Sequence, residues 1–387
     1  MMKLLETIKA RFFTDQKPLS PGTFHYQAPP EAEFPYRIHL RVEKDGNGLL
    51  ILNASTILHL NQTATEFVWH MIEKTSEDET ARSIARRYNV PHKQAQEDYH
   101  NLLDKLNTLI TMPDLDPVTF LEFSRSEPYA EAMSAPYRLD CALTYKVNIA
   151  DQNTVAPVER VKRELTHDEW KAILTKSWQA GIPHIIFTGG EPTLRPDLPE
   201  LIKHAEDQGQ VTGLLTNGYM LTKPHYRQQL LENGLDHLMI LLYPHEDQSW
   251  EVIRDVMPED IFTTVHITIT TKILDEFESI LDKLRALEVE SLSLSVNDLA
   301  LKDKIQEVHQ AAVEREFSLV WDLPVPYSKL NPVSLEAEEE TPLPDGAGRA
   351  WLYVEPDGDV LVSQGYPDVM GNILTDTWDK IWEKHPE

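Results

Sequence analysis

Two segments of the chain combine glycines with polar residues in a pattern that can hold a ligand. In IIFTGGEPTLRPDL an apolar strand runs into two glycines, a glutamate and a proline, and in LLTNGYML another apolar strand runs into a Thr-Asn-Gly turn. Glycines at the carboxyl end of a parallel strand let a ligand approach the backbone, and ligands of α/β folds bind at that end. An ordinary turn between strand and helix also explains each segment when it is taken alone. The candidate ligand-binding residues are Gly189, Gly190, Glu191, Pro192, Thr216 and Asn217.

A third segment, RLDCALTYKVNIADQNT, holds Cys141, the only cysteine among 387 residues. One cysteine excludes an internal disulfide and a thiolate-rich metal cage. Two interpretations of Cys141 therefore remain. It is either the remnant of a metal or redox site, or a small apolar residue inside a buried strand.

Histidines and acids elsewhere give weaker signals for a metal site. His184, His204, His225, His237, His245 and His266 are scattered without an HxH or HxxxH spacing. The segment YPHEDQ gathers His245, Glu246 and Asp247 at the end of a predicted strand, although a polar loop has the same composition. We therefore expect no metal site in these segments.

The charge balance limits the classes of partner. Sixty-three acidic residues against 36 basic ones give a formal net charge of −27, which repels nucleic acid and anionic lipid. No apolar run approaches the roughly 20 residues of a membrane span, and the first residues lack the features of a signal peptide. We expect a cytoplasmic protein without nucleic-acid or membrane partners. A short basic cluster at Arg82, Arg86 and Arg87 keeps a DNA-binding alternative open.

Residues 36–113 have the pattern of a small α+β domain. Alternating apolar and polar residues in YRIHLRVE, GLLILN and TILHLN predict three antiparallel strands. Three segments with helical spacing follow, and Ser76 with Glu79 forms a plausible capping box at the second. This order is typical of a winged-helix-like domain. Residues 1–35 are predicted to be an extended N-terminal segment, because residues 17–35 are rich in proline and polar residues.

Residues 138–330 alternate apolar strands with helices and predict a parallel sheet covered by helices, closed into a partial barrel. A linker at 114–137 precedes this region, and an acidic linker at 331–348 follows it. Residues 349–387 are predicted to form a small C-terminal unit, because WLYVEPDGDVLVSQG has the turn chemistry of a hairpin and DTWDKIWEK has helical spacing.

Together these segments resemble those of the radical S-adenosylmethionine (radical SAM) superfamily. FTGGEPTLRPDL followed by LLTNG is similar to its GGEP segment, which lies against the methionyl amino group of S-adenosylmethionine in a partial (β/α)6 barrel. The N-terminal region, through LLILNASTILHLNQTATEFVWHMI, resembles the PqqD peptide-recognition domain. The C-terminal YVEPDGDVLVSQG and MGNILTDTWDKIW are similar to the SPASM or twitch extension. The order of the three resemblances is that of fused peptide maturases.

The resemblance also shows what this chain lacks. In the family the first barrel strand ends in LTxxCNxxCxxC, whose thiolates hold a 4Fe-4S cluster. Here the sequence is LTYKVNIADQNT. Aligned on its Leu-Thr and Asn, this segment has Val147, Asp151 and Thr154 at the positions of the three cluster cysteines. A register that begins at Cys141 puts Tyr145 and Asn148 at the other two positions, and neither supplies a thiolate. Ser363 likewise stands where the C-terminal extension would carry a cysteine.

The resemblance implies a pseudoenzyme or scaffold that binds a precursor peptide. The peptide would add as a strand at Ile57, Leu58, His59 and Leu60, beside the helix 93–109, and an intact radical SAM homologue is a candidate partner. We expect no 4Fe-4S cluster and only weak binding of S-adenosylmethionine. The loss of the cluster residues favours a protein that is not an enzyme. Two alternatives stay open: an active maturase whose cluster ligands are noncanonical or supplied by a partner, and a winged-helix DNA-binding protein.

Overall fold

The computed structural model describes residues 18–29, 31–34, 36–54, 56–112, 133–148, 155–320, 323–331 and 343–386. The chain divides into two compact units, Met1–Ser134 and Ala135–Glu387, each of which is described by itself. Asp151 and Thr154, most of the predicted linker 114–137 and much of the predicted linker 331–348 lie outside the described residues. Within the described part of the chain, no helix has the length and apolar character needed to cross a membrane.

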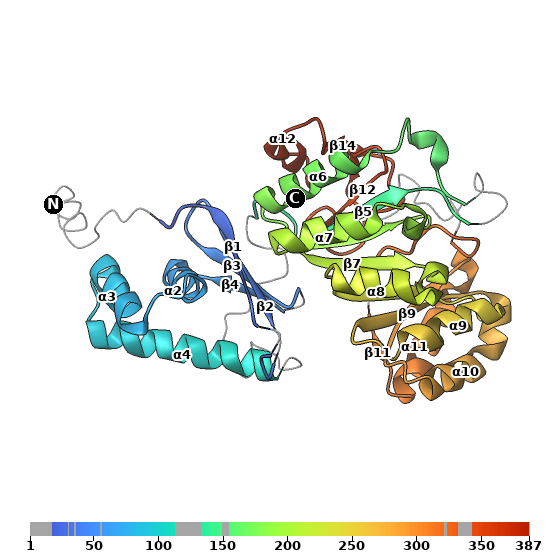
Figure 1. Cartoon of the computed structure of the whole chain (residues 1–387), viewed down its shortest axis with the longest axis horizontal. Helices are drawn as coiled ribbons and strands as arrows, with labels where there is room; N and C mark the ends of the chain where they lie inside the picture. The colour runs from blue at the N-terminus through green and yellow to red at the C-terminus, as the bar shows by residue number, and fades with distance from the viewer. Residues whose placement is uncertain are drawn as a thin grey trace. The chain divides into compact units, whose positions relative to one another are not determined.

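The described residues of the first unit form an antiparallel meander with three helices (Figure 1). Its strands follow the order β1-β2-β3-β4 in the sheet, and the second, third and fourth are the three that the alternation predicts. The elements are β1 (Gly22–Gln27), β2 (Arg37–Val42), β3 (Gly48–Leu52), β4 (Thr56–Leu60), α2 (Gln62–Ile72), α3 (Glu77–Tyr88) and α4 (His92–Thr111). As predicted, Ser76 caps α3, since its hydroxyl accepts a hydrogen bond from the Glu79 amide.

Strand β1 differs from the expectation for residues 1–35. It pairs with β2 along its whole length instead of preceding the domain as a separate lead-in. The physical reason is that Phe24 and Tyr26 pack against the apolar core between sheet and helices, whereas His25 and Gln27 alternate with them. Flanking prolines obscured this short alternation in the sequence.

The second unit confirms the predicted α/β class with a mainly parallel sheet. Its described strands form one sheet in the order β11-β10-β9-β8-β7-β6-β5-β12-β13-β14, parallel from β11 to β12 and antiparallel thereafter. The strands are β5 (Arg138–Thr144), β6 (His184–Gly189), β7 (Val211–Thr216), β8 (His237–Leu241), β9 (Phe262–Ile269), β10 (Ser291–Val296), β11 (Ser318–Leu319), β12 (Trp351–Val354), β13 (Asp359–Leu361) and β14 (Val369–Asn372).

Helices cover one face of this sheet. They are α6 (His167–Ala180), α7 (Leu198–Gln208), α8 (Pro224–Glu232), α9 (Asp247–Val256), α10 (Thr271–Ala286), α11 (Ile305–Glu314) and α12 (Trp378–Trp382), with short 3-10 turns η2 (Val158–Arg160), η3 (Pro192–Leu194), η4 (Tyr219–Thr222) and η5 (Leu299–Lys304). Val265, Ile267 and Ile269 of β9 pack with helices α10 and α11, so the alternate residues Thr264 and His266 face the barrel interior.

The C-terminal extension completes this sheet. Strand β12 pairs in parallel with β5, and β13 and β14 add a hairpin beside it. The Lys176 ammonium in α6 donates to the carbonyl oxygens of Ile373, Leu374 and Asp376, at 2.6, 3.2 and 3.0 Å. The extension is therefore part of the second compact unit, whereas the domain boundaries drawn from the sequence remain predictions.

Candidate functional site

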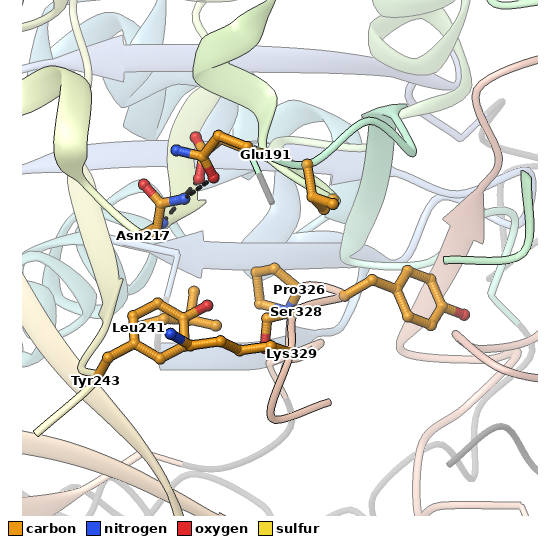
Figure 2. Close-up of a pocket in the computed structure, with 11 residues that line it drawn as sticks. Glu191, Asn217, Leu241, Tyr243, Pro326, Ser328 and Lys329 are labelled. Atoms are coloured by element: carbon orange, nitrogen blue, oxygen red, sulfur yellow. Dashed lines mark hydrogen bonds between the residues drawn. The ribbon is translucent and has the colours of Figure 1, made fainter. Parts of the chain in front are cut away.

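Glu191 joins the two candidate ligand-binding segments. Its carboxylate is 2% exposed, and its Oε1 accepts hydrogen bonds from the Thr193 amide (3.0 Å), the Thr193 hydroxyl (2.5 Å) and the Thr216 hydroxyl (2.7 Å). Its Oε2 accepts from the Asn217 amide at 2.9 Å, as the dashed line in Figure 2 shows. Burial raises the pKa of the Glu191 carboxyl. The chain's own donors thus surround this carboxylate, at the shared carboxyl end of β6 and β7.

The glycines of this corner are required by a close approach of the backbone. A Cβ atom on Gly189 would lie 2.2 Å from the Thr144 carbonyl oxygen, and one on Gly190 would lie 2.4 Å from the Lys146 carbonyl oxygen. The Gly190 and Glu191 amides donate to those same oxygens, both at 2.8 Å. Gly189 and Gly190 therefore pack the GGEP segment against the end of β5, a role that needs no ligand. Pro192 follows directly and begins the turn η3.

The end of β5 holds apolar side chains where the cluster ligands were sought. Val147 is 4% exposed and packs in an apolar cluster with Tyr145, Tyr327 and other residues. One residue further, the Asn148 side-chain oxygen accepts a hydrogen bond of 2.9 Å from the Asn217 side-chain amide. The first predicted cluster position is thus part of a hydrophobic core, and its neighbour ties the strand end to the GGEP corner.

Cys141 lies inside β5 and is fully buried, which confirms that it is a small buried strand residue. Its sulfur lies 4.0 Å from the Leu139 carbonyl oxygen, and burial raises the pKa of its thiol well above the ordinary value. Iron–sulfur clusters need several thiolate ligands. A neutral buried thiol and a valine do not meet that need, so these residues do not fit a conventional 4Fe-4S cluster.

A small cavity lies between the GGEP corner and the segment that follows β11. Its volume is about 10 Å³, room for about one water molecule. Figure 2 shows Glu191 and Asn217 on one side of it, with Pro326, Ser328 and Lys329 on the other. The lining residues are Val147, Asn148, Gly190, Glu191, Asn217, Leu241, Tyr243, Pro326, Tyr327, Ser328 and Lys329.

Several of these lining residues were not singled out from the sequence. Leu241 is the last residue of β8, and Tyr243 follows shortly after it. Because parallel strands share their carboxyl ends, the alternation of strands and helices could have predicted that these two residues lie near GGEP. Residues 326–329 carry no such signal, because their position depends on the fold of the whole chain after β11.

The YPHEDQ segment does not form one site. His245 Nε2 lies 3.0 Å from a Glu276 carboxylate oxygen, whereas the Glu246 carboxylate binds the Tyr219 hydroxyl and the Lys329 ammonium. Asp247 begins helix α9. The three side chains therefore serve separate contacts, as expected for a polar loop.

Three of the candidate histidines, His184, His237 and His266, lie on the strands of the barrel. His184 and His237 approach with 2.8 Å between their Nε2 atoms, and burial lowers the pKa of His237 to about 4. His266 bonds to the hydroxyls of Ser293, Thr268 and Ser295, and burial lowers its pKa to about 3. His237 and His266 are therefore neutral at physiological pH and belong to the packed interior.

The predicted peptide-binding residues lie on β4. This strand has one strand neighbour in the described sheet, β3. Leu58 and Leu60 face the apolar core under the helices, while the register puts Ile57 and His59 on the opposite face.

Two families of known proteins match parts of the chain. Residues 141–242 match the sequence model of the Radical SAM superfamily. Residues 48–109 match that of coenzyme PQQ synthesis protein D (PqqD). The two matches fall in different units, the first from β5 to just beyond β8 and the second from β3 to α4.

Curated relatives include two PqqA peptide cyclases. The protein of Bradyrhizobium diazoefficiens is 38% identical over 122 residues, 31% of this chain and 31% of that protein. The protein of Streptomyces rochei is 28% identical over 256 residues, 59% of this chain and 70% of that protein. The chain thus matches about a third of the first relative's length.

Solved structures of SuiB from Streptococcus suis share the fold. The structure bound to the precursor peptide SuiA has a TM-score of 0.56 at 14% identity and covers 90% of this chain and 88% of that one. The structure bound to S-adenosylmethionine has a TM-score of 0.55 at 15% identity and covers 90% and 87% of the two chains. At this level of identity the likeness shows the fold.

Proposed function

We propose that this chain, a radical SAM protein with a PqqD-like domain, binds an extended precursor peptide and does not carry out cluster-dependent radical chemistry. The observation that carries the proposal is Val147, an apolar residue in a packed core at the first cluster position. Reductive cleavage of S-adenosylmethionine needs an electron delivered through the cluster, and the chain's single thiol is buried in β5. Asp151 and Thr154 offer a carboxylate and a hydroxyl at the other two positions, which are poor donors for such a cluster.

The edge of β4 is the proposed peptide-binding surface. An extended peptide gains affinity from main-chain hydrogen bonds along an open sheet edge and specificity from its side chains. The described strands of the first unit lie in the order β1-β2-β3-β4, so β1 is one edge strand of this sheet and β4 is the other. Ile57 and His59 would contact the peptide on one face, and helix α4 would select side chains on the other. The names of the PqqA peptide cyclases and the SuiB complex with SuiA support a precursor peptide as the ligand.

Binding of S-adenosylmethionine to the GGEP corner should be weak. Gly189, Gly190, Glu191, Pro192, Thr216 and Asn217 remain the proposed contacts. The iron that would chelate the methionyl amino and carboxylate groups has no conventional ligand set here. The barrel would serve as a scaffold, or as a noncatalytic partner of an intact homologue.

Anaerobic reconstitution with iron and sulfide tests the loss of the cluster. We expect the protein to stay colourless with less than one iron per chain, and Cys141→Ala to give the same result. A brown protein with about four irons per chain would instead support an active maturase with other ligands.

Binding of a synthetic PqqA peptide tests the β4 surface. Ile57 and His25 lie in the same cross-strand row on the same face, on the opposite edge strands β4 and β1, which makes them a matched pair. We expect Ile57→Asp in the full chain to weaken binding about tenfold by fluorescence anisotropy, whereas His25→Asp changes it less than twofold. Equal effects of the two variants, or no binding to the unmodified chain, would contradict the proposal.

The contacts of the basic cluster argue against DNA binding. Arg82 forms an ion pair with Asp78, and Arg87 forms one with the buried Glu66 at 2.6 Å. Two of the three arginines thus neutralise acids of their own unit and contribute less to a phosphate-binding surface.

A further inference from the structure

Residues 323–331, here called the strap, lie across the carboxyl ends of the barrel strands. Leu323 packs against Ile186, Leu215 and Met239, one residue from each of β6, β7 and β8. The register of these strands puts the three side chains on the face shared with Thr264, which is the barrel interior. The strap therefore begins with an aliphatic side chain inserted into the barrel.

Tyr327 brings the strap into contact with the GGEP segment. Its amide donates a hydrogen bond of 2.8 Å to the Gly189 carbonyl oxygen. Its ring packs edge-to-face on Tyr145, with 5.4 Å between the ring centroids, in the cluster that contains Val147. Tyr327 is 3% exposed, so the contact is part of a packed core.

Polar contacts hold the rest of the strap. The Ser328 hydroxyl accepts hydrogen bonds from the Leu330 and Asn331 amides, at 3.3 and 3.2 Å, and the Lys329 ammonium lies 4.7 Å from the centre of the Tyr243 ring. Lys329 also forms an ion pair with Glu246, and Gln364 donates to the Val325 carbonyl oxygen at 2.9 Å. Figure 2 shows Lys329 lying against Tyr243, opposite Glu191 and Asn217.

We propose that the strap is an intramolecular ligand of the barrel mouth and that it must leave before S-adenosylmethionine can bind there. The Tyr327 amide gives the GGEP backbone the kind of N–H donor that the methionyl amino group would otherwise provide. The cavity between the strap and the GGEP corner is about 10 Å³, whereas sites for ligands of this size are about 300 Å³ or more. The strap and the nucleotide therefore exclude each other.

This inference deepens the weak nucleotide binding of the proposed function and is independent of peptide capture. It predicts that loosening the strap increases affinity. The Lys329 side chain is 44% exposed, so Lys329→Ala removes the Glu246 ion pair without opening the core. Tyr327→Gly removes the buried ring and leaves the backbone free to move.

Calorimetric titration of the full-length variants with S-adenosylmethionine tests the proposal. We expect Lys329→Ala to bind at least threefold more tightly than the unmodified chain and Tyr327→Gly at least tenfold. Val313→Ser, on the exposed side of α11, is the matched control and should not change the affinity. The proposal is overturned if neither variant binds more tightly than the unmodified chain, including the case in which no titration gives heat. The iron content of the same preparations measures the loss of cluster chemistry separately, so the two proposals can fail independently.

Discussion

The GGEP corner and the end of β5 lie together at the carboxyl ends of neighbouring strands. The interactions that stabilise these two regions differ. At the corner, the Glu191 carboxylate accepts four hydrogen bonds from Thr193, Thr216 and Asn217. At the end of β5, the Val147 side chain packs in an apolar cluster with Tyr145 and Tyr327. The corner satisfies its own polar groups, so it is stable without a ligand. Val147, at the first cluster position, instead adds to the apolar core of this unit.

The largest test of this difference is the replacement of Glu191 by leucine. Glu191→Leu leaves the buried amides of Thr193 and Asn217 without an acceptor, and we expect the free energy of unfolding to fall by about 4 kcal/mol. Urea denaturation followed by tryptophan fluorescence measures the change. Glu251→Leu, at an exposed position of α9, is the control and should change stability by less than about 0.5 kcal/mol. A loss below about 1 kcal/mol for Glu191→Leu would mean that the corner is not self-supporting.

The pH dependence of stability extends the comparison to a buried base. The folded-state pKa of His266 is lowered from 6.5 to about 3, so the unfolded chain binds the proton first. The stabilisation that comes from neutral His266 is complete above pH 6.5 and is lost as the pH falls. At pH 5 the free energy of unfolding should have decreased by about 2 kcal/mol for this reason. Glu191 has a raised pKa and acts in the opposite direction, since its contribution is complete below its unfolded pKa and is lost as the pH rises through its folded pKa.

Denaturation of the His266→Gln and Glu191→Gln variants between pH 4 and 8 separates the two effects. We expect His266→Gln to flatten the acid side of the stability profile and Glu191→Gln to make it steeper, because Glu191 contributes more stability as the pH falls. The same acid slope in the His266 variant as in the unmodified chain would assign the slope to other groups.

The hydrogen bond between Asn148 and Asn217 connects the two regions directly. A double-mutant cycle with Asn148→Ala and Asn217→Ala should give a coupling energy of about 1 kcal/mol, the usual size for a neutral hydrogen bond. Denaturation of the unmodified chain, both single variants and the double variant provides the four values. Additive effects would mean that the regions are energetically independent.

The smallest change in stability is expected when a thiol is placed at the end of β5. Val147→Cys keeps a small apolar side chain in the core, so the free energy of unfolding should fall by only about 0.5 kcal/mol. Thermal denaturation measures the loss, and Val147→Asp is the contrasting variant because it buries a charge. If Val147→Cys is as harmful as Val147→Asp, the site tolerates no polar atom and the comparison with the GGEP corner must be revised.

The sequence was most informative where a pattern is local or where parallel strands end on the same side of the sheet. Alternation predicted β2 to β4, and the common carboxyl end of parallel strands predicted that Glu191, Thr216 and Asn217 lie close together. The strap could not be predicted, because Leu323 and Tyr327 contact residues from distant strands and carry no periodicity. The place of β12 was missed for the same reason, since a parallel neighbour leaves no mark on the sequence of β5.

The pairing of β12 with β5 has a consequence for how the protein is made. The hydrogen bond between the Tyr145 hydroxyl and Glu355 joins residues 210 positions apart. On the ribosome, β5 emerges long before β12, and until then one of its edges has no partner. An unpaired edge of this kind promotes aggregation. We therefore expect nascent chains that stop before β12 to depend on chaperones. The described strands of the first unit pair in chain order, so we expect this sheet to form as it emerges.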